Sequence, residues 1–332
     1  MHAPKFWHQP VGLWARLLSP LGALYAHVTR KRVARAPKIM ASVPVICVGN
    51  INAGGTGKTP SVIALVMLLT ERGYSPHVVT RGYGGKITGP TEVNIARHKA
   101  SYTGDEPLII APFAPVWIAK DRAAGVEAAI AAGADVIVMD DGHQNPDVKK
   151  DVSIIVVDAL LGFGNGKGIP AGPLREPIEA GLARADVVLS IGDVETQEVF
   201  ATTNPVAIPH VTATLKPLET GMDWSDGRYF AFAGIGYPEK FFRTLRGLGA
   251  NLVGTQGLED HQSLSSALLS RLERDAAQLN AQLVTTEKDA ARLPPAWRHK
   301  VLSLPVRLAW NNQDTLEDAL EAKLGPPPLP RL

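Results

Sequence analysis

A glycine-rich segment at residues 50–60 carries the strongest chemical signal in the sequence. It reads Asn-Ile-Asn-Ala-Gly-Gly-Thr-Gly-Lys-Thr-Pro. Glycines let the backbone turn its N–H groups onto phosphate oxygens, which side chains would obstruct. Lys58 can reach the β- and γ-phosphates of a nucleotide, and the hydroxyl of Thr59 can ligate Mg²⁺. The general pattern G-x-x-x-x-G-K-[ST] has a glycine where this chain has Asn52, so the segment is a variant phosphate loop.

The segments on either side of this loop are those that a phosphate loop requires. Residues 43–48 form a short apolar run that is typical of a buried parallel strand, and the apolar residues of 61–71 indicate a buried helix. The N-terminus of that helix adds positive potential for phosphates. Strand, loop and helix together predict a nucleotide site, with contacts from Asn52, Ala53, Gly54, Gly55, Thr56, Gly57, Lys58 and Thr59.

Strand-like and helix-like runs alternate through the next part of the chain. This alternation predicts an α/β fold of the P-loop NTPase type, a mostly parallel sheet with helices on both faces. Functional groups should then gather at the carboxyl ends of the strands. The strand-like runs are 77–80, 116–119, 135–139, 153–157 and 186–191, and the clearest helix-like runs are 121–132 and 177–185.

Four sets of charged residues fall near the ends of these predicted elements. Asp140 and Asp141 follow an apolar strand, the layout of a Walker B segment in which a carboxylate holds Mg²⁺ directly or through water. Each set has an ordinary alternative as a turn, a helix start or a surface ion pair. Their position behind a phosphate loop favours a functional interpretation. The other three sets are Arg81, Asp105 with Glu106, and Arg175 with Glu176.

The N-terminal segment is basic and carries a stripe of apolar residues. Residues 1–70 contain eight Lys/Arg and no acidic residue, whereas residues 71–332 carry 26 basic and 32 acidic residues, a net charge of −6. This asymmetry suggests an anionic partner such as a membrane surface, a nucleic acid or an acidic ligand. The stripe has helical spacing and comprises Trp7, Val11, Trp14, Leu18, Leu21, Tyr25 and Val28.

Charge placement and interruptions exclude two interpretations of this segment. A secretory signal has its positive charges before the apolar core, whereas most of those here follow it. A spanning helix needs about 20 uninterrupted apolar residues, and Arg16, Pro20 and His27 interrupt this one. Two alternatives stay open: a helix lying in a membrane interface, and a helix packed on the protein's own core.

Length and composition set the remaining bounds. The 332 residues suffice for a large α/β domain and a smaller one. An apolar fraction of 45% and a charged fraction of 20% are typical of a well-packed globular protein. Cys47 is the single cysteine, which excludes a disulfide framework and a cysteine-based zinc site.

Taken together, the motifs resemble those of the tetraacyldisaccharide 4′-kinase family, the lipid A kinases of Gram-negative bacteria. The resemblance covers nearly the whole chain, and His143 departs from it because the family commonly has phenylalanine there. We expect this departure to alter packing rather than chemistry. The motifs that carry the resemblance are the loop of residues 50–60, Arg-Gly-Tyr-Gly at 81–84, Gly-Asp-Glu-Pro at 104–107, Asp-Asp-Gly-His-Gln at 140–144, Gly-Pro-Leu-Arg-Glu-Pro at 172–177, and Asp260-His261.

The resemblance implies a reaction and roles for these residues. The reaction is transfer of the ATP γ-phosphate to the 4′-hydroxyl of a tetraacylated glucosamine disaccharide 1-phosphate, forming lipid IVA at the inner membrane. Asp105 would be the base and His261 its partner, while Lys58 would neutralise the γ-phosphate. Arg81 and Arg175 would contact the transferred phosphoryl group or the acceptor's anionic groups. The implied Mg²⁺ shell is Thr59, Asp140, Asp141 and Glu176.

We expect three regions along the chain. Residues 1–38 would form the membrane-associated amphipathic helix, 39–203 the P-loop kinase domain, and 204–332 a smaller α/β domain that closes the cleft. In this last region we expect strands at 206–215, 228–234 and 283–286, helices at 238–248 and 263–279 with Ser263 as a cap, a helix starting at 287, and an irregular tail at 326–330.

Two rival functions remain at this stage. One is a P-loop switch ATPase or GTPase, although no convincing Asn-Lys-x-Asp motif for guanine is present. The other is a kinase or ligase that acts on a soluble small molecule. For the lipid kinase we expect ATP and Mg²⁺ as cofactors, a peripheral location on the cytoplasmic face of the inner membrane, and neither a nucleic acid nor an obligate protein partner.

Overall fold

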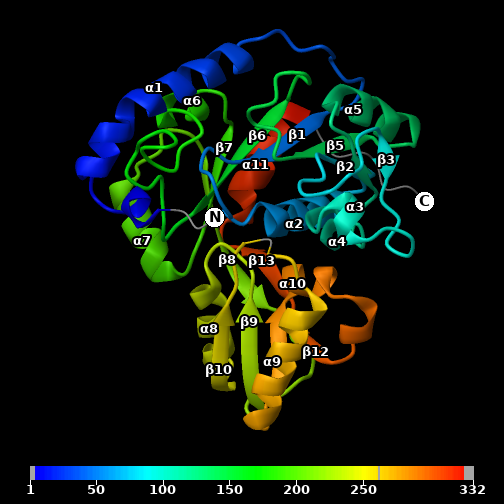
Figure 1. Ribbon diagram of the computed structural model, residues 1–332. Coiled ribbons are helices and arrows are strands. Elements are labelled where there is room, and N and C mark those ends of the chain that lie inside the picture. The colour runs from blue at the N-terminus through cyan, green and yellow to red at the C-terminus, as the bar shows by residue number, and fades with distance from the viewer. Residues whose placement is uncertain (1–3, 261, 325–332) are drawn as a thin grey trace.

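The computed structural model describes residues 4–260 and 262–324, which form two α/β units (Figure 1). The larger unit is built on a nine-stranded sheet in the order β13-β8-β7-β6-β1-β5-β2-β4-β3. All pairings are parallel except β3 with β4 and β13 with β8. The strands are β1 (Val45–Gly49), β2 (Pro76–Thr80), β3 (Thr91–Glu92), β4 (Val116–Ile118), β5 (Val136–Asp140), β6 (Val152–Asp158), β7 (Val187–Ile191), β8 (His210–Pro217) and β13 (Val306–Trp310).

Helices cover both faces of this sheet, which explains why its central strands are apolar along their whole length. In β1, Ile46 and Val48 face a cluster with α2, α4 and α11, whereas Val45 and Cys47 face α5 on the opposite side. The helices α6 and α7 cover the part of the sheet near β6 and β7. Their bounds are α2 (Lys58–Glu71), α4 (Glu106–Ile110), α5 (Arg122–Ala131), α6 (Ile178–Leu182), α7 (Val194–Thr203) and α11 (Gln313–Leu324), with the short α3 (Ala100–Thr103) before α4.

The smaller unit is a four-stranded parallel sheet in the order β10-β9-β11-β12. Phe230 and Phe232 face α9 on one side, while Tyr229 and Ala231 face α8 on the other. Successive side chains of β9 point to opposite faces of the sheet, so this strand contributes to the hydrophobic clusters on both sides of it. The elements are β9 (Arg228–Ala233), α8 (Pro238–Gly247), β10 (Asn251–Gly257), α9 (Ser266–Gln278), β11 (Gln282–Thr286), α10 (Glu287–Arg292), the 3₁₀ turn η2 (Pro295–Trp297) and β12 (Val301–Leu304).

The boundary expected between residues 203 and 204 does not coincide with the change of sheet. β8 pairs with β7 in the large sheet, and β13 pairs with β8 after the chain has built the smaller unit. The helix α11 then packs against the large sheet through Leu316 and Leu320. β8, β13 and α11 therefore belong to the large unit, although the sequence analysis assigned residues 204–332 to the smaller domain.

The N-terminal helix α1 (Leu13–Val33) lies along the outside of the large unit, after the 3₁₀ turn η1 (Lys5–His8) (Figure 1). Its inward face is made of small residues, since Ala15, Gly22 and Thr29 are its buried positions. A Cβ added at Gly22 would lie 2.8 Å from the carbonyl oxygen of Gly168, so the helix closely approaches the loop before α6. Within residues 4–260 and 262–324, no helix is long and apolar enough to cross a membrane.

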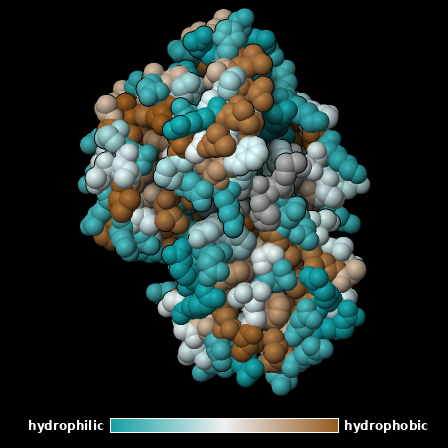
Figure 2. All heavy atoms as spheres, turned by 60° about the vertical axis from the view of Figure 1, so that its left-hand side comes forward, coloured by the Kyte–Doolittle hydropathy of each residue, from teal (hydrophilic) through white to brown (hydrophobic). Residues whose placement is uncertain are grey.

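Most of the predicted apolar stripe of α1 faces outward. Trp14 is 65% exposed, and Leu21, Tyr25 and Val28 are exposed as well. Figure 2 turns this side of the molecule forward and shows hydrophobic side chains on the upper surface, where α1 lies. The helix therefore packs on the large unit through its small residues, while most of the apolar stripe is exposed.

Candidate active site

The phosphate loop joins the end of β1 to the start of α2, as the sequence predicts. Gly54 and Gly57 have φ angles of +112° and +93°, a conformation that favours glycine. A Cβ on Gly57 would also lie 2.6 Å from Cδ1 of Ile191, whereas one on Gly54 or Gly55 would meet nothing within 4 Å. The loop thus turns an uncluttered backbone toward open space, where phosphate oxygens could lie.

Asn52 holds the loop from the side that faces the protein. It is 4% exposed, and its Nδ2 donates a hydrogen bond of 2.9 Å to the carbonyl oxygen of Gly162. The backbone N–H of Ala53 donates to the carbonyl oxygen of Pro173 at 2.7 Å. The asparagine that departs from the general P-loop pattern therefore ties the loop to the segment before α6. Contacts of Asn52 and Ala53 with a nucleotide stay a prediction.

A cluster of charged residues faces the start of α2. Nζ of Lys58 lies 3.6 Å from Oδ1 of Asp141, and Nη1 of Arg175 lies 3.0 Å from the same oxygen. Asp141 follows β5 with a φ of +52°, which is rare for a residue with a side chain. Residues from three separate segments thus meet where the sequence predicted a nucleotide.

The two carboxylates after β5 have opposite electrostatic settings. Burial, with Glu106 and Asp141 nearby, raises the pKa of Asp140. Burial alone would raise the pKa of Asp141 too, but Lys58 and Arg175 hold it below its ordinary value. Oδ2 of Asp140 accepts a hydrogen bond from Thr80, whereas Oδ1 has no hydrogen-bond partner in the described part of the chain.

This setting fits a divalent cation. A buried carboxylate with an unpaired oxygen gains from a nearby positive charge, and Mg²⁺ prefers oxygen ligands. Among residues 4–260 and 262–324, no group of three or more His, Cys, Asp or Glu side chains could hold a metal by itself. A Mg²⁺ ion here would therefore need further oxygens, such as those of nucleotide phosphates and of Thr59.

Glu176 differs from the other predicted Mg²⁺ ligands because both its oxygens are already engaged. Nη2 of Arg184 donates to them at 2.9 and 2.8 Å, and Nε2 of Gln144 donates to Oε1 at 2.9 Å. Gln144 also donates to the carbonyl oxygen of Asn50 at the start of the phosphate loop, at 2.8 Å. Glu176 thus braces the loop through Gln144, and its place in the Mg²⁺ shell stays a prediction.

Asp105 lies at the start of α4 with its side chain 3% exposed. Oδ1 accepts a hydrogen bond of 3.1 Å from the N–H of Glu106. Gly104 before it has a φ of +83°, and a Cβ there would lie 2.3 Å from the carbonyl oxygen of Tyr83. The turn that begins with the exposed Arg81 therefore packs directly against the turn that holds Asp105. His261, its predicted partner, lies outside the described residues.

Sequence reasoning gave no role to three polar residues around the site, of which Arg122 and Gln144 are buried and Arg292 is largely shielded. Arg292 of α10 reaches Asp105 across the two units, with Nε 3.7 Å from Oδ2. Gln144 bridges Glu176 and Asn50, and Arg122 donates to the carbonyl oxygen of Ala119 at 2.5 Å. Burial lowers the pKa of Arg122, and the nearby Asp140 and Asp141 oppose that shift. Arg122 follows the end of β4, so the rule that found the other residues could have included it, whereas Arg292 is the last residue of α10 and falls outside that rule.

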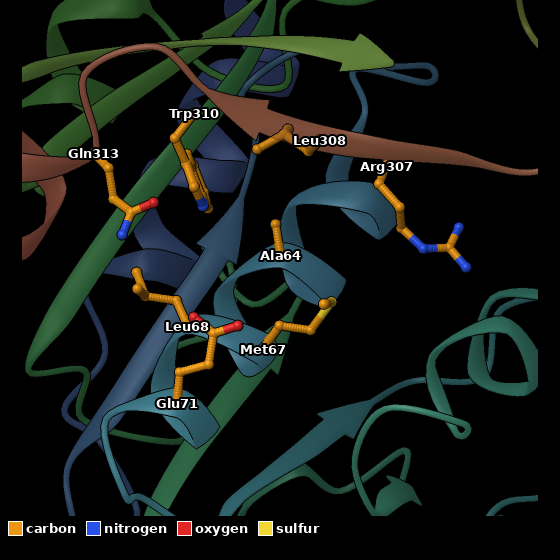
Figure 3. Close-up of a pocket in the computed structure, with 8 residues that line it drawn as sticks. All are labelled: Ala64, Met67, Leu68, Glu71, Arg307, Leu308, Trp310 and Gln313. Atoms are coloured by element: carbon orange, nitrogen blue, oxygen red, sulfur yellow. The ribbon is translucent and has the colours of Figure 1, made fainter. Parts of the chain in front are cut away.

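A pocket of about 180 Å³ lies between α2 and β13, away from this cluster (Figure 3). It is lined by the C-terminal half of α2, including Met67 and Glu71, and by Trp310 of β13. Lys58, at the first turn of α2, is not among its lining residues. None of the residues that the sequence assigned to catalysis, nucleotide or metal lines this pocket.

His143 is buried against the base of the phosphate loop. It is 2% exposed, its Nε2 lies 3.1 Å from the carbonyl oxygen of Gly181, and a Cβ on Gly49 would lie 2.6 Å from its own Cβ. Burial lowers the pKa of His143 to about 4, with Arg184 as the next contribution in the same direction. The imidazole is therefore neutral in the folded protein at pH 7, in keeping with the packing role that we expect.

A pH dependence of stability follows from this buried imidazole. Unfolded chains bind a proton at this histidine below pH 6.5, whereas the folded protein does so only near pH 4. Because of this difference, the free energy of unfolding decreases as the pH falls from 6.5 toward 4, by at most about 1.4 kcal/mol per pH unit. We expect His143→Phe to lose less stability than the natural protein between pH 7 and pH 5 in urea unfolding. An equal loss in both proteins would contradict the prediction.

Comparison with known proteins places these motifs in a family. Residues 14–325 match the family model described as tetraacyldisaccharide-1-P 4′-kinase. The tetraacyldisaccharide 4′-kinase of Jannaschia sp. (strain CCS1) is 54% identical over 327 residues, 98% of this chain and 100% of that protein. The enzyme of the same name from Dinoroseobacter shibae is 57% identical over 327 residues, 97% of each chain.

A solved structure shares the fold. It is a crystal structure of LpxK from Aquifex aeolicus, described as an "apo" form in complex with ATP. The TM-score is 0.75 at 23% sequence identity, with 94% of this chain and 100% of that chain covered. At this identity the likeness concerns the fold alone, whereas the family match and the two close relatives concern the sequence. This chain therefore belongs to the tetraacyldisaccharide-1-P 4′-kinase family.

Proposed function

We propose that this protein transfers the γ-phosphate of ATP to the 4′-hydroxyl of tetraacyldisaccharide 1-phosphate, which gives lipid IVA. The observation that carries the proposal is the meeting of Lys58, Asp141 and Arg175 at the phosphate loop. A loop that exposes backbone N–H groups beside two cations is suited to a triphosphate, because both stabilise the charge of the transferred group. Family membership supplies the acceptor, since both close relatives are named for it.

Each residue has a defined part in this reaction. Asp105 accepts the proton of the 4′-hydroxyl while the oxygen–phosphorus bond forms and the bond between the β-phosphate oxygen and the γ-phosphorus breaks. Lys58 and Arg175 stabilise the charge on the γ-phosphate, and Arg81 binds an anionic group of the acceptor or the transferred phosphoryl group. Thr59, Asp140 and Asp141 would hold Mg²⁺, with Glu176 behind them. Mg²⁺ supplies charge neutralisation at the phosphates when it is bound.

The acceptor is a lipid, and the exposed face of α1 supports a position on a membrane surface. Leu13, Trp14 and Leu17 are between 65% and 79% exposed, and the last turn of the helix carries Arg30, Lys31 and Arg32. Apolar side chains beside a basic cluster suit the interface of an anionic bilayer. We place the protein peripherally, on the cytoplasmic face of the inner membrane where ATP is present.

A single charge on the apolar face of α1 should weaken membrane binding. Burying a leucine contributes about 1.5–3 kcal/mol, so we expect Leu17→Glu to lower the partition coefficient by about tenfold or more. The measurement is flotation with vesicles that contain phosphatidylglycerol. Val199→Glu is the matched control, because Val199 is 57% exposed on α7 and carries no role in the proposal. Equal flotation of both variants would show that the apolar face of α1 does not contribute to membrane binding.

Transfer itself is tested with γ-labelled ATP and tetraacyldisaccharide 1-phosphate in mixed micelles. We expect label in the lipid and ADP release that depends on the acceptor. A P-loop switch ATPase would instead release inorganic phosphate without labelling the lipid. Label that appears only when soluble sugars replace the lipid would favour the kinase for a soluble small molecule.

A further inference from the structure

Helix α10 of the smaller unit directs an arginine at the proposed base. The helix packs against α3 and α4, the elements of the large unit that flank Asp105. Nε of Arg292 lies 3.7 Å from Oδ2 of Asp105, and the side chains are 11% and 3% exposed. An ion pair this well shielded from water is more strongly coupled than one on the surface.

The guanidinium is anchored firmly at its other end. Nη2 pairs with Asp289, which is fully buried, and also donates to the carbonyl oxygen of Gly234 at 3.3 Å. Nη1 donates to the carbonyl oxygen of Gln262 at 2.9 Å. Asp289 in turn accepts from the N–H of Gly234 at 2.9 Å and from the hydroxyl of Thr286 at 2.7 Å. Bonds on both Nη atoms fix the planar group, so its orientation does not depend on Asp105.

The bonds that anchor the guanidinium do not use the N–H on Nε, the nitrogen that lies 3.7 Å from Oδ2 of Asp105. This nitrogen is buried and has no hydrogen-bond partner among residues 4–260 and 262–324. A buried donor left unsatisfied costs free energy, and structures retain such groups where another function requires them. Here the donor faces a carboxylate at a distance slightly too long for a hydrogen bond, which a small closing movement of α10 toward α4 would complete.

The anchoring network also reaches the phosphate loop. Gly234 belongs to the turn after β9, and a Cβ on Gly236 in the same turn would lie 3.8 Å from the N–H nitrogen of Gly55. A Cβ on Gly234 itself would lie 2.9 Å from both Nη2 of Arg292 and Oδ1 of Asp289. The network that anchors Arg292 and the turn that lies near the phosphate loop are therefore parts of one segment of the smaller unit.

We infer that Arg292 is a positioning residue that orients the Asp105 carboxylate and holds it ionised, so that the base is set only when the smaller unit is docked. This inference rests on the proposed function. A cation beside a carboxylate favours its ionised form, and only that form can take the proton of the acceptor hydroxyl. A purely structural Arg292, which joins α10 to the turn after β9, would affect folding but would leave the chemical step unchanged.

The test compares three full-length variants in the labelled-ATP assay. We expect Arg292→Gln to lower kcat by about tenfold or more, since the effect of a base is about 10²–10⁴-fold and a positioning residue carries part of it. The KM for ATP should stay within about threefold, and Arg292→Lys should recover part of kcat because it keeps the charge. Arg307→Gln is the matched control, because Arg307 pairs with Glu287 at the start of the same helix without touching Asp105. We expect its kcat to stay within about twofold of the natural enzyme.

A double variant separates positioning from a general loss of structure. In an Asp105→Asn background, Arg292→Gln should cost less than about threefold further, because the group that it serves is already absent. A full multiplicative loss in that background, or a natural kcat in Arg292→Gln, overturns the inference. Failure of the proposed function is distinguishable, since the natural enzyme would then label no lipid at all. Urea unfolding of each variant identifies any that fails to fold, and Arg292→Lys then decides alone.

Discussion

Replacing Lys58 with alanine is expected to abolish phosphoryl transfer. The ammonium group lies 3.6 Å from Asp141 and is 13% exposed, so it acts in a shielded site where a charge has a large effect. Removing a single preorganised donor to a developing negative charge typically costs about 10²–10³-fold in kcat, and a full positive charge on the γ-phosphate should cost at least that much. The measurement is single-turnover transfer of label from ATP to tetraacyldisaccharide 1-phosphate.

Two controls make this result specific. Lys323→Ala removes a lysine that is 51% exposed and pairs with Asp186, and we expect its rate to equal that of the natural enzyme. Lys58→Arg keeps the charge but changes its shape and reach, so it should recover only a small part of the rate. A Lys58→Ala enzyme that retains more than about a tenth of its activity would show that Arg175 suffices for the γ-phosphate, and the role of Lys58 would fall.

The carboxyl ends of the parallel strands explain why much of the site could be predicted. Lys58, Asp141 and Arg175 are far apart in the sequence, yet each follows a strand-like run or the phosphate loop that comes after one. Parallel strands place such residues at one edge of the sheet whatever the length of the segments between them. The strands themselves are apolar runs with sharp ends, so 135–139 and 116–119 match β5 and β4 to within one residue.

The sequence does not show which distant segments pair with one another. β8 and β13 consist mostly of partly buried residues, which suit the edge of either sheet, so no local signal showed that the boundary at 204 was misplaced. The cap of α9 is Ser265 rather than Ser263, because a serine two residues on can accept the same bond. Arg184, likewise, occupies both oxygens of Glu176 from beyond α6, in a contact that no spacing rule predicts.

The role that we infer for Arg292 could not be predicted from the sequence either. Its neighbours in the sequence mark the start of a helix and nothing more. Its importance appears only when the smaller unit is placed on the larger one, because the partner Asp105 belongs to the other unit. A residue that acts across two units carries no signature in its own segment. The roles of such residues are therefore the hardest to predict from sequence motifs.

Replacing Asp105 with alanine should lower kcat while ATP binding is largely spared. The carboxylate is 3% exposed at the start of α4, and we assign to it the proton of the acceptor hydroxyl. A general base contributes about 10²–10⁴-fold, so a loss of that size is expected in the chemical step. The dissociation constant for ATP, measured by calorimetry, should change by less than about threefold, because we expect the phosphates to bind at Lys58 and the glycine loop instead.

Asp105→Asn separates the role of the base from the hydrogen bond that this side chain makes with the N–H of Glu106. Asparagine keeps an oxygen that can accept from the N–H of Glu106, so it retains the helix cap, which is worth about 1 kcal/mol. It cannot take a proton, and it removes the negative charge beside Nε of Arg292, whose pairing with Asp289 remains. We therefore expect Asp105→Asn to lose as much kcat as Asp105→Ala but less stability toward urea. If either enzyme stays within threefold of the natural kcat, Asp105 is not the base, and another group must accept the proton of the 4′-hydroxyl.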